Sequence, residues 1–288
     1  MAHALAAEAR KSRLKGDTEL IDVFASPMTT SPAQPRRAIL ITGAASGIGA
    51  ATARRFIKEG WQVAINCIDL SQREAASAIA SSASAAGQQS IVLEGDVTRD
   101  ADCQSLVERT VTAFGRLDAL VNAAGISKMV PQADLHGLSA EDFQRIYAVN
   151  TIGPFQMIRA AAPHLKASGS GAVVNITSRA GITGGGSSIA YAASKGAANT
   201  LTLSLARVLA PEIRVNAVCP ALVEHGFVER LAPASFAERK ARQIAMSPLQ
   251  RIGKPDEVAE TIHWLISSAS MMTGALVELD FGIHLNAT

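Results

Sequence analysis

The sequence predicts an α/β fold: a single doubly wound domain with a mostly or wholly parallel seven-stranded sheet and helices on both faces. Short apolar runs, of the kind that form strands buried on both faces of a sheet, alternate with longer stretches that have helical spacing. The alternation is unbroken from residue 38 to about residue 280. Because strand–helix–strand repeats pair their strands in parallel through right-handed crossovers, helices are expected on both faces.

Each expected element corresponds to one stretch of the chain. The expected strands are the apolar runs at 38–42, 62–67, 90–95, 119–122, 172–177, 213–219 and 275–280. The expected helices lie near 48–59, 71–86, 101–114, 139–166, 190–209 and 255–268. The long connection at about 221–250 mixes apolar and charged side chains, which favours a lid that closes over a substrate.

The first part of the chain differs from the rest. Residues 1–36 end in the turn-rich stretch TTSPAQPRR and contain Met28, an alternative start. We therefore expect residues 1–36 to be a tail that is either poorly ordered or partly non-native. The folded domain is expected to span residues 37–288.

The composition excludes several classes of function. Hydrophobic residues make up 48% of the 288 residues and the net charge is only +2, so a large core is expected without a basic surface for nucleic acid. No apolar run approaches the ~18 residues of a membrane span. The three cysteines are far apart, which fits reduced thiols in a cytoplasmic protein. The histidines show no grouping typical of metal ligands, so no metal is expected.

A glycine-rich segment, TGAASGIGA at 42–50, directly follows the first expected strand. Such glycines let the backbone approach a pyrophosphate, and the helix that begins near Gly47 turns free N–H groups and the positive end of its dipole towards that anion. A plain tight turn is the alternative, but the position within a βαβ unit favours a dinucleotide. Its expected contacts here are Gly43, Ser46, Gly47, Ile48 and Gly49.

The end of the second strand is where such folds usually discriminate between nicotinamide cofactors. An acidic side chain there accepts hydrogen bonds from the 2′-hydroxyl of NAD and repels the 2′-phosphate of NADP. This chain has Cys67 there, which cannot fill the acidic role, followed two residues later by Asp69, whose reach to the ribose the sequence leaves open. Both are candidate cofactor contacts, and the pattern weakly favours NADP(H) over NAD(H).

The segment YAASK at 191–195 places Tyr191 one helical turn before Lys195, so that both side chains share a face. An ammonium about 4–5 Å from the phenol would favour the phenolate by roughly 3–4 kcal/mol at an effective dielectric constant of ~20, before desolvation is subtracted. This pair is therefore expected to act as an acid or base near neutral pH. A core tyrosine beside a surface lysine is the alternative.

Four features taken together resemble the short-chain dehydrogenase/reductase family. They are TGAASGIG at 42–49, NAAG at 122–125, Ser178 thirteen residues before Tyr191, and the Tyr-x-x-x-Lys pair itself. The segment PLQRIGKPDEVA at 248–259 is similar to one in the 3-oxoacyl-carrier-protein reductase-like branch. The resemblance covers residues 38 to about 282 and implies a Rossmann-like, dinucleotide-binding catalytic domain.

The resemblance also implies roles for individual residues. Ser178 would orient and polarise a carbonyl oxygen, Tyr191 would transfer the proton, and Lys195 would lower the pKa of the tyrosine and bind ribose. Asn150 would support a proton relay through water, although it could instead satisfy a helix kink. The further implied cofactor contacts, besides Tyr191 and Lys195 themselves, are Asp96, Val97, Asn122, Ala123, Ala124, Gly125, Pro220 and Val223. Asn122 is expected mainly to tie neighbouring strands together.

The implied activity is the NAD(P)-dependent interconversion of a ketone and a secondary alcohol by hydride transfer. The leading substrate is a 3-oxoacyl thioester, and a sugar, polyol or steroid-type alcohol is the alternative. A non-catalytic NAD(P)-binding redox sensor is the alternative from another class. The family also implies a homotetramer, or a homodimer, acting on a small-molecule carbonyl or alcohol substrate.

Some positions depart from the family pattern. Ala221 replaces a usual glycine, His225 stands where a threonine is expected, and Phe281 occupies another usual glycine position. His225 could donate to a cofactor phosphate or point outward as a loop side chain. The lid segment carries a basic cluster, which could meet an acidic carrier or phosphopantetheine group or could simply be solvated: Arg230, Arg239, Lys240 and Arg242.

Overall fold

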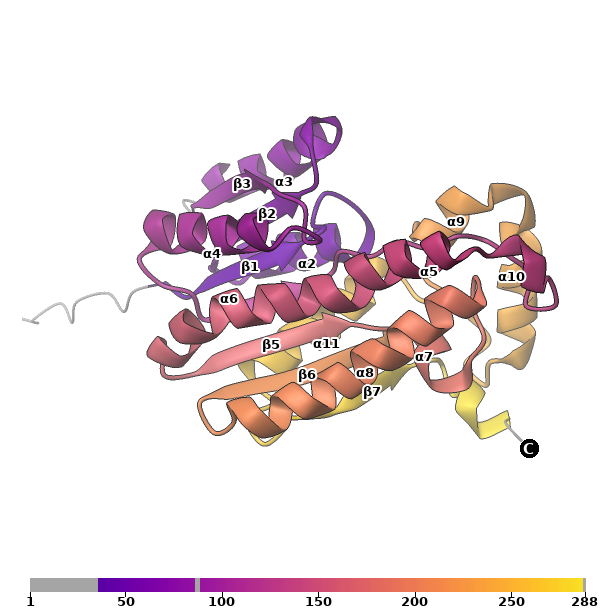
Figure 1. Ribbon diagram of the computed structural model, residues 1–288. Helices are drawn as coiled ribbons and strands as arrows, with labels where there is room; N and C mark the ends of the chain where they lie inside the picture. Colours follow the sequence, from indigo (N-terminus) through magenta and orange to yellow (C-terminus); the bar gives the residue numbers. More distant parts are fainter. Residues whose placement is uncertain (1–35, 86–88, 287–288) are drawn as a thin grey trace, which may run out of the picture. The chain divides into compact units, whose positions relative to one another are not determined.

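The computed structural model describes residues 36–85 and 89–286, which contain one seven-stranded sheet (Figure 1). Every pair of neighbouring strands is parallel, and the strand order is β3-β2-β1-β4-β5-β6-β7. The strands are β1 (Ala38–Thr42), β2 (Gln62–Cys67), β3 (Ser90–Glu94), β4 (Ala119–Asn122), β5 (Gly171–Ile176), β6 (Ile213–Pro220) and β7 (Leu276–Leu279). The predicted doubly wound fold is therefore confirmed, and the order reverses between β1 and β4.

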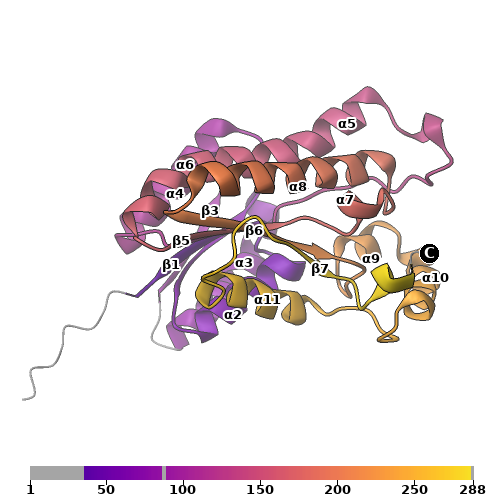
Figure 2. The ribbon, with the colours of Figure 1, turned by 90° about the horizontal axis from the view of Figure 1, so that it is seen from below.

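Helices cover both faces of the sheet, as Figure 2 shows in edge view. One face carries α2 (Gly47–Lys58), α3 (Arg73–Ala85) and α11 (Pro255–Ser267). The opposite face carries α4 (Asp100–Phe114), α6 (Gly153–Ala167) and α8 (Ile189–Leu209). Each face has its own apolar core, because consecutive strand residues point to opposite sides. In β1, Ile39 and Ile41 join one core and Leu40 joins the other.

The predicted helix at 139–166 is interrupted. It consists of α5 (Ala140–Tyr147), a π-helical turn η3 (Ala148–Ile152) and α6. Ser139 starts α5 with a capping box to Asp142. Pro154, at the start of α6, lacks an N–H and its ring crowds the carbonyl one turn earlier, which accounts for the wider turn that contains Asn150.

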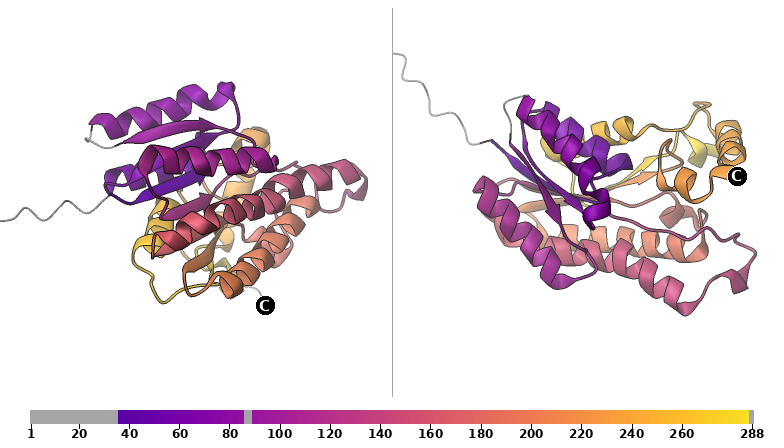
Figure 3. Two further views of the ribbon diagram at one scale, coloured as in Figure 1. Left: turned by 60° about the vertical axis from the view of Figure 1, so that its left-hand side comes forward. Right: turned by 90° about the horizontal axis from the view of Figure 1, so that it is seen from above.

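The segment predicted as a lid contains two helices, α9 (Phe227–Leu231) and α10 (Pro233–Met246). Both lie at the same end of the sheet as α5 and the short α7 (Ala180–Thr183) (Figure 3). The remaining short elements are the 3-10 turns η1 (Leu70–Gln72), η2 (Leu135–Gly137) and η4 (Ile283–Asn286).

The expected tail at 1–36 lies, apart from Arg36, outside the described residues. Within the described ranges, every helix is too short or too polar to cross a bilayer.

Candidate active site

A cavity of about 910 Å³ opens at the carboxyl ends of the central strands. Doubly wound sheets bind their ligands there, next to the point where the strand order reverses. The walls come from the loops after β1, β4, β5 and β6, from the start of α8, and from α10. Three of the four predicted catalytic residues line it, namely Ser178, Tyr191 and Lys195.

The glycine-rich turn after β1 forms one end of the cavity. Gly43 has a φ of +59°, and a Cβ there would lie 2.7 Å from the Cα of Ala124. A Cβ on Gly49 would lie 2.5 Å from the carbonyl oxygen of Gly43. The turn therefore requires glycine at both positions, and the start of α2 opens onto the cavity with Ser46, Gly47 and Ile48 on its wall. This cradle fits a dinucleotide pyrophosphate.

Asn66, which the sequence analysis missed, braces this cradle. Its Oδ1 accepts a hydrogen bond from the N–H of Gly43 at 3.2 Å, and its Nδ2 donates to the carbonyl of Gly95 at 3.0 Å. Asn66 lines the cavity, whereas the predicted contact Cys67 is fully buried in the core and does not. The pKa of the Cys67 thiol is raised, mainly because the thiol is buried. The amide of Asn66, next to last in the largely apolar run QVAINC, was the available signal.

The expected discriminator at the end of β2 does not face the cavity. The Asp69 carboxylate caps η1 by accepting a hydrogen bond from the N–H of Ser71 at 2.9 Å. Hydrogen bonds from the Ser71 side chain and backbone lower the pKa of Asp69. Arg73, the first residue of α3, forms an ion pair with Glu94 at the end of β3. The cavity wall at this point is instead formed by Ile68 and Gln72.

The predicted contacts after β3 and β4 are largely on the cavity wall. Asp96 and Val97 line it, and Asp96 accepts a hydrogen bond from the N–H of Thr98 at 2.9 Å. The backbone stretch of Ala123, Ala124 and Gly125 also lines it.

Asn122, by contrast, is buried behind the wall. Its Nδ2 donates to Asn175 Oδ1 at 2.9 Å, which ties β4 to β5. Asn175 in turn donates to Thr202 Oγ1 on α8 at 2.9 Å, so the same chain of amides also holds α8 to the sheet.

Tyr191 and Lys195 lie one turn apart near the start of α8. Ser188 caps this helix by accepting a hydrogen bond from the N–H of Tyr191 at 3.3 Å. The Lys195 Nζ lies 5.8 Å from the centre of the Tyr191 ring and donates to the carbonyl of Ile176 at 2.8 Å. Ser178 lies two residues after the end of β5, and its hydroxyl is hydrogen-bonded to Tyr191. The three side chains therefore converge from two elements.

The electrostatic expectation for this pair is wrong in direction. Burial raises the pKa of Tyr191 to about 12, and only the hydrogen bond with Ser178 acts in the opposite sense. Burial also lowers the pKa of Lys195 to about 8. Desolvation outweighs the attraction because both groups are buried, and the ammonium donates to the backbone carbonyl of Ile176.

Asn150 lies behind the cavity wall, in the π-helical turn η3. Its Oδ1 accepts a hydrogen bond from the N–H of Ile126 at 2.9 Å. Its Nδ2 donates to the carbonyl of Ile126 and to Ser194 Oγ, each at 3.0 Å. The amide therefore fixes the loop after β4 against α8, next to Lys195.

The departures from the family pattern have clear positions. Ala221 lines the cavity, together with the predicted contacts Pro220 and Val223. His225 does not line it: its side chain is 79% exposed, and its Nδ1 lies 3.7 Å from Oε2 of Glu229. Phe281 has a φ of +60°, a conformation that glycine adopts freely, which explains why a glycine is usual there. Its ring packs under the guanidinium of Arg251, 4.9 Å from the ring centre.

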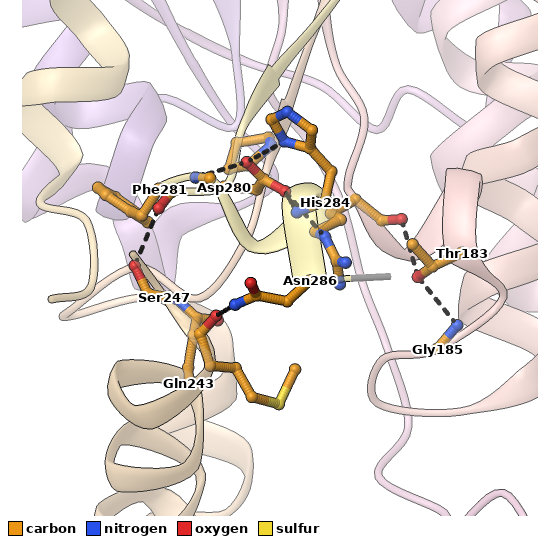
Figure 4. Close-up of polar contacts among 12 residues, drawn as sticks. Thr183, Gly185, Gln243, Ser247, Asp280, Phe281, His284 and Asn286 are labelled. Atoms are coloured by element: carbon orange, nitrogen blue, oxygen red, sulfur yellow. Dashed lines mark hydrogen bonds and ion pairs between the residues drawn. The ribbon is translucent and has the colours of Figure 1, made fainter. Parts of the chain in front are cut away.

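A polar cluster at the end of β7 braces the loop that carries Ser178 (Figure 4). Buried Asp280 accepts a hydrogen bond from Arg179 Nε at 3.2 Å and from the N–H of His284 at 2.8 Å. With Glu278, Asp280 and His284 bring potential metal-ligand atoms within 4.8 Å of one another, a grouping that the sequence analysis did not foresee. The Asp280 oxygens are already engaged by these internal contacts.

Comparisons with known proteins agree with this architecture. A family model described as enoyl-(acyl carrier protein) reductase matches residues 43–284. The chain is 38% identical over 260 residues to a Streptomyces violaceoruber protein assigned as ketoacyl reductase 2 of the granaticin polyketide synthase, covering 89% of this chain and 99% of that protein. It is 37% identical over 248 residues to the 3-oxoacyl-[acyl-carrier-protein] reductase of Thermotoga maritima, covering 85% and 96%.

A solved structure from Burkholderia xenovorans, of a protein assigned to the short-chain dehydrogenases/reductases, superimposes with a TM-score of 0.80 at 44% identity. The match covers 87% of this chain and 98% of the other. With this fold, this glycine cradle and these relatives, the chain belongs to the short-chain dehydrogenase/reductase family of NAD(P)-binding oxidoreductases.

Proposed function

We propose that this enzyme interconverts a ketone and a secondary alcohol, using Ser178, Tyr191 and Lys195 beside a bound nicotinamide cofactor. The observation that carries the proposal is that these three side chains and the glycine cradle line the same cavity. The cofactor, when bound, supplies or accepts the hydride at the carbonyl carbon. The protein supplies binding, orientation and the proton.

The cofactor would be held by the residues of the cradle and of the neighbouring loops. The free N–H groups at the start of α2 face the position proposed for the pyrophosphate. Asp96 and Val97 would hold the adenine, and Lys195 would hold a ribose. NADP(H) is favoured over NAD(H), because the Asp69 carboxylate is engaged by Ser71 and stands off the cavity wall.

The proposed proton transfer follows from the pKa values of Tyr191 and Lys195. With a pKa of about 12, Tyr191 is protonated at neutral pH and can donate its phenolic proton to the substrate oxygen during reduction. Lys195, with a pKa of about 8, is a cation that can return a proton to the phenolate. Ser178 would hold the substrate oxygen, and Asn150 would support proton exchange with solvent behind Gly125.

For the substrate we propose a 3-oxoacyl thioester. The names of the Streptomyces and Thermotoga relatives specify a ketoacyl and a 3-oxoacyl reductase, respectively, and this chain covers nearly their whole length. A sugar, polyol or steroid-type alcohol is the alternative that a substrate panel would reveal.

We further propose that the enzyme is a cytoplasmic homotetramer or homodimer. Large apolar side chains are exposed on one side of the domain, on η3, α6 and α8, and they support assembly through these helices: Ile152, Phe155, Leu203 and Val208. Light scattering after size-exclusion chromatography measures the oligomeric state directly, and a monomer would contradict this proposal.

The reaction is tested with Tyr191→Phe, which removes the proposed proton donor and keeps the ring. Wild type is expected to oxidise NADPH in the presence of a 3-oxoacyl thioester, and the variant to lose turnover by about 10²–10⁴-fold while binding cofactor unchanged. Full activity in the variant would contradict the proposed role of Tyr191. Cofactor binding by wild type without turnover of any ketone or alcohol would favour the redox sensor.

Preference between the two cofactors needs a separate titration. Fluorescence titration of wild type with NADPH and with NADH is expected to give the lower dissociation constant for NADPH. The opposite order would overturn the proposed preference without affecting the reaction.

A further inference from the structure

The cavity carries more positive charge than the proposed hydride transfer needs. Among the described residues that line it, Asp96 is the one acidic side chain, whereas five are basic: Arg179, Lys195, Arg230, Arg239 and Arg242. Arg179 is neutralised by Asp280 at 3.2 Å, and Lys195 belongs to the reacting pair. Three guanidinium groups of the lid remain without an assigned role.

These three guanidinium groups have no acidic partner within the part of the chain that the structure describes: none has a nitrogen within 4.0 Å of a carboxylate oxygen. Arg230 Nη1 donates to the carbonyl of His225 at 3.3 Å, and Arg239 Nε donates to Ser235 Oγ at 3.2 Å.

The acidic side chains of the lid segment at 221–250 do not pair with these three arginines. Glu224 pairs with Lys240 at 2.7 Å, and Glu229 accepts a hydrogen bond from the N–H of His225 at 2.7 Å. Glu238 is exposed and does not line the cavity, although it lies one turn before Arg242. Cationic groups that line a cavity and lack acidic partners favour an anionic ligand.

Two of these arginines, Arg239 and Arg242, are exposed residues on the part of α10 that lines the cavity. Arg239, Arg242, Gln243 and Met246 follow the spacing i, i+3, i+4, i+7 and so form one face of the helix, which lines the cavity. Gln243 Oε1 accepts a hydrogen bond from the N–H of Leu222 at 2.8 Å, which attaches this face to the loop after β6.

The end of α10 is fixed as well. Asn286 Nδ2 donates to the carbonyl of Met246 at 2.7 Å, and Ser247 Oγ donates to the carbonyl of Phe281 at 3.1 Å (Figure 4). The same C-terminal turn holds Asp280, which binds Arg179 beside Ser178. The cavity face of α10 is therefore anchored to the loop that carries Ser178, the residue proposed to hold the substrate oxygen.

Arg230 differs from the other two arginines because it belongs to the cofactor side. It binds the carbonyl oxygen of His225, and this oxygen is the nearest atom, at 4.0 Å, to the position of a Cβ on Gly47. Arg230 is therefore close to the glycine cradle, where the cofactor pyrophosphate is proposed to lie. Arg239 and Arg242 remain for a second anion.

We propose that Arg239 and Arg242 bind an anionic group of the substrate, a carboxylate or a phosphate, while its carbonyl or hydroxyl group lies at Ser178 and Tyr191. Arginine is suited to this because its planar fork matches both anions. Met246 supplies apolar contact for the carbon chain between the two groups. The inference rests on the proposed oxidoreductase function and specifies its substrate class: an amphipathic anion.

The test compares substrates that differ only in the anion, and its two pairs separate the two sources of negative charge. The first pair is levulinate, with its longer homologues, against the corresponding methyl esters. The second pair is acetoacetyl-4′-phosphopantetheine against acetoacetyl-pantetheine, which lacks the phosphate. Values of kcat/KM are measured for wild type, Arg239→Gln and Arg242→Gln. Lys240→Gln is the control, because Lys240 is on the same helix but off the cavity wall.

Wild type is expected to prefer the charged member of at least one pair by about 10- to 100-fold, the contribution of hydrogen bonds to a charged group. The two arginine variants lose this preference and turn over the neutral member at the wild-type rate, whereas Lys240→Gln keeps it. Arg242→Lys retains the charge and keeps part of the preference, so a variant that merely misfolds is recognised. Equal kcat/KM for charged and neutral members in wild type overturns the proposal.

Binding separates this inference from the proposed function. Calorimetry with Tyr191→Phe, saturated with oxidised cofactor, measures the affinity for the acid and for its ester without turnover. Preference for the acid that depends on Arg242, in an enzyme that reduces no ketone, would uphold the anion site and refute the reaction. Turnover of ketones without any preference for the acid over the ester would uphold the proposed reaction and refute the anion site. Weaker cofactor binding in Arg239→Gln or Arg242→Gln would assign these arginines to the cofactor and overturn the proposal.

Discussion

Replacement of Lys195 by methionine tests how strongly burial opposes the charge on this lysine. The side chain is 5% exposed, and burial lowers its pKa from 10.5 to about 8. Because one pKa unit corresponds to ~1.4 kcal/mol, the charged side chain costs the folded state about 3 kcal/mol. Methionine has a similar length and carries no charge, but it forfeits the hydrogen bond to Ile176, worth about 1 kcal/mol.

The sign of the pH dependence follows from proton counting. Between about pH 8 and about pH 10.5, the unfolded chain keeps a proton on this lysine that the folded chain has lost, so the wild-type free energy of unfolding rises with pH. The methionine variant lacks this rise. Below pH 8 the variant is therefore expected to be more stable than wild type by about 2 kcal/mol, and this advantage disappears by about pH 10.5. Tyr191, with a pKa of about 12, contributes nothing to the difference below about pH 10.

The assay is urea unfolding followed by circular dichroism, at one protein concentration, from neutral pH to about pH 10.5. Lys58→Met is the control, because Lys58 is exposed on α2 and its removal corrects for the change in net charge. Parallel pH profiles for wild type and Lys195→Met would refute the reasoning, since they would mean that the folded protein holds this proton as tightly as the unfolded chain does.

Two further predictions concern the backbone. Gly43→Ala is expected to cost about 1–3 kcal/mol of stability and to weaken cofactor binding, because Gly43 has a φ of +59° and the new Cβ would lie 2.7 Å from the Cα of Ala124. Urea unfolding measures the stability and a cofactor titration measures the affinity. Unchanged values of both would refute the close approach. Gln250→Gly is expected to raise the free energy of unfolding by about 1 kcal/mol, because exposed Gln250 has a φ of +51°, which strains a residue with a side chain. A lower free energy of unfolding in the same urea assay would show that Gln250 is unstrained.

Much of the fold was predictable because the signals are local. Strands buried on both faces appear as uninterrupted apolar runs, and the bounds of β1, β2 and β4 match the predicted ones. The helix at 139–166 was predicted as continuous, since the effect of Pro154 on the preceding turn depends on how Asn150 is held from elsewhere. Helices α9 and α10 were not predicted, because the mixture of apolar and charged side chains at 221–250 was interpreted only as a lid.

The residues of the candidate site were predictable where motif spacing defines them. They were less predictable where tertiary contacts determine the direction or the burial of a side chain. The spacing identified Ser178, Tyr191 and Lys195, which converge on the cavity. It did not reveal that Asn66 rather than Cys67 faces the cavity, because side-chain direction depends on how the cradle turns back over β2. It also could not weigh burial against attraction for the tyrosine and lysine, since desolvation depends on the surrounding packing.

The central position of β1 has a consequence for how the protein is made. Its partners are β2 on one side and β4 on the other, and Ile39 is in register with Ala119, 80 residues later. Thr42 Oγ1 accepts hydrogen bonds from the N–H groups of Ala123 and Ala124, so the nucleotide cradle is completed from the far side. A nascent chain that has emerged only through β3 therefore has an open sheet edge and half a cradle. The contacts of Thr42 with Ala123 and Ala124 can therefore form only after the fourth strand has left the ribosome.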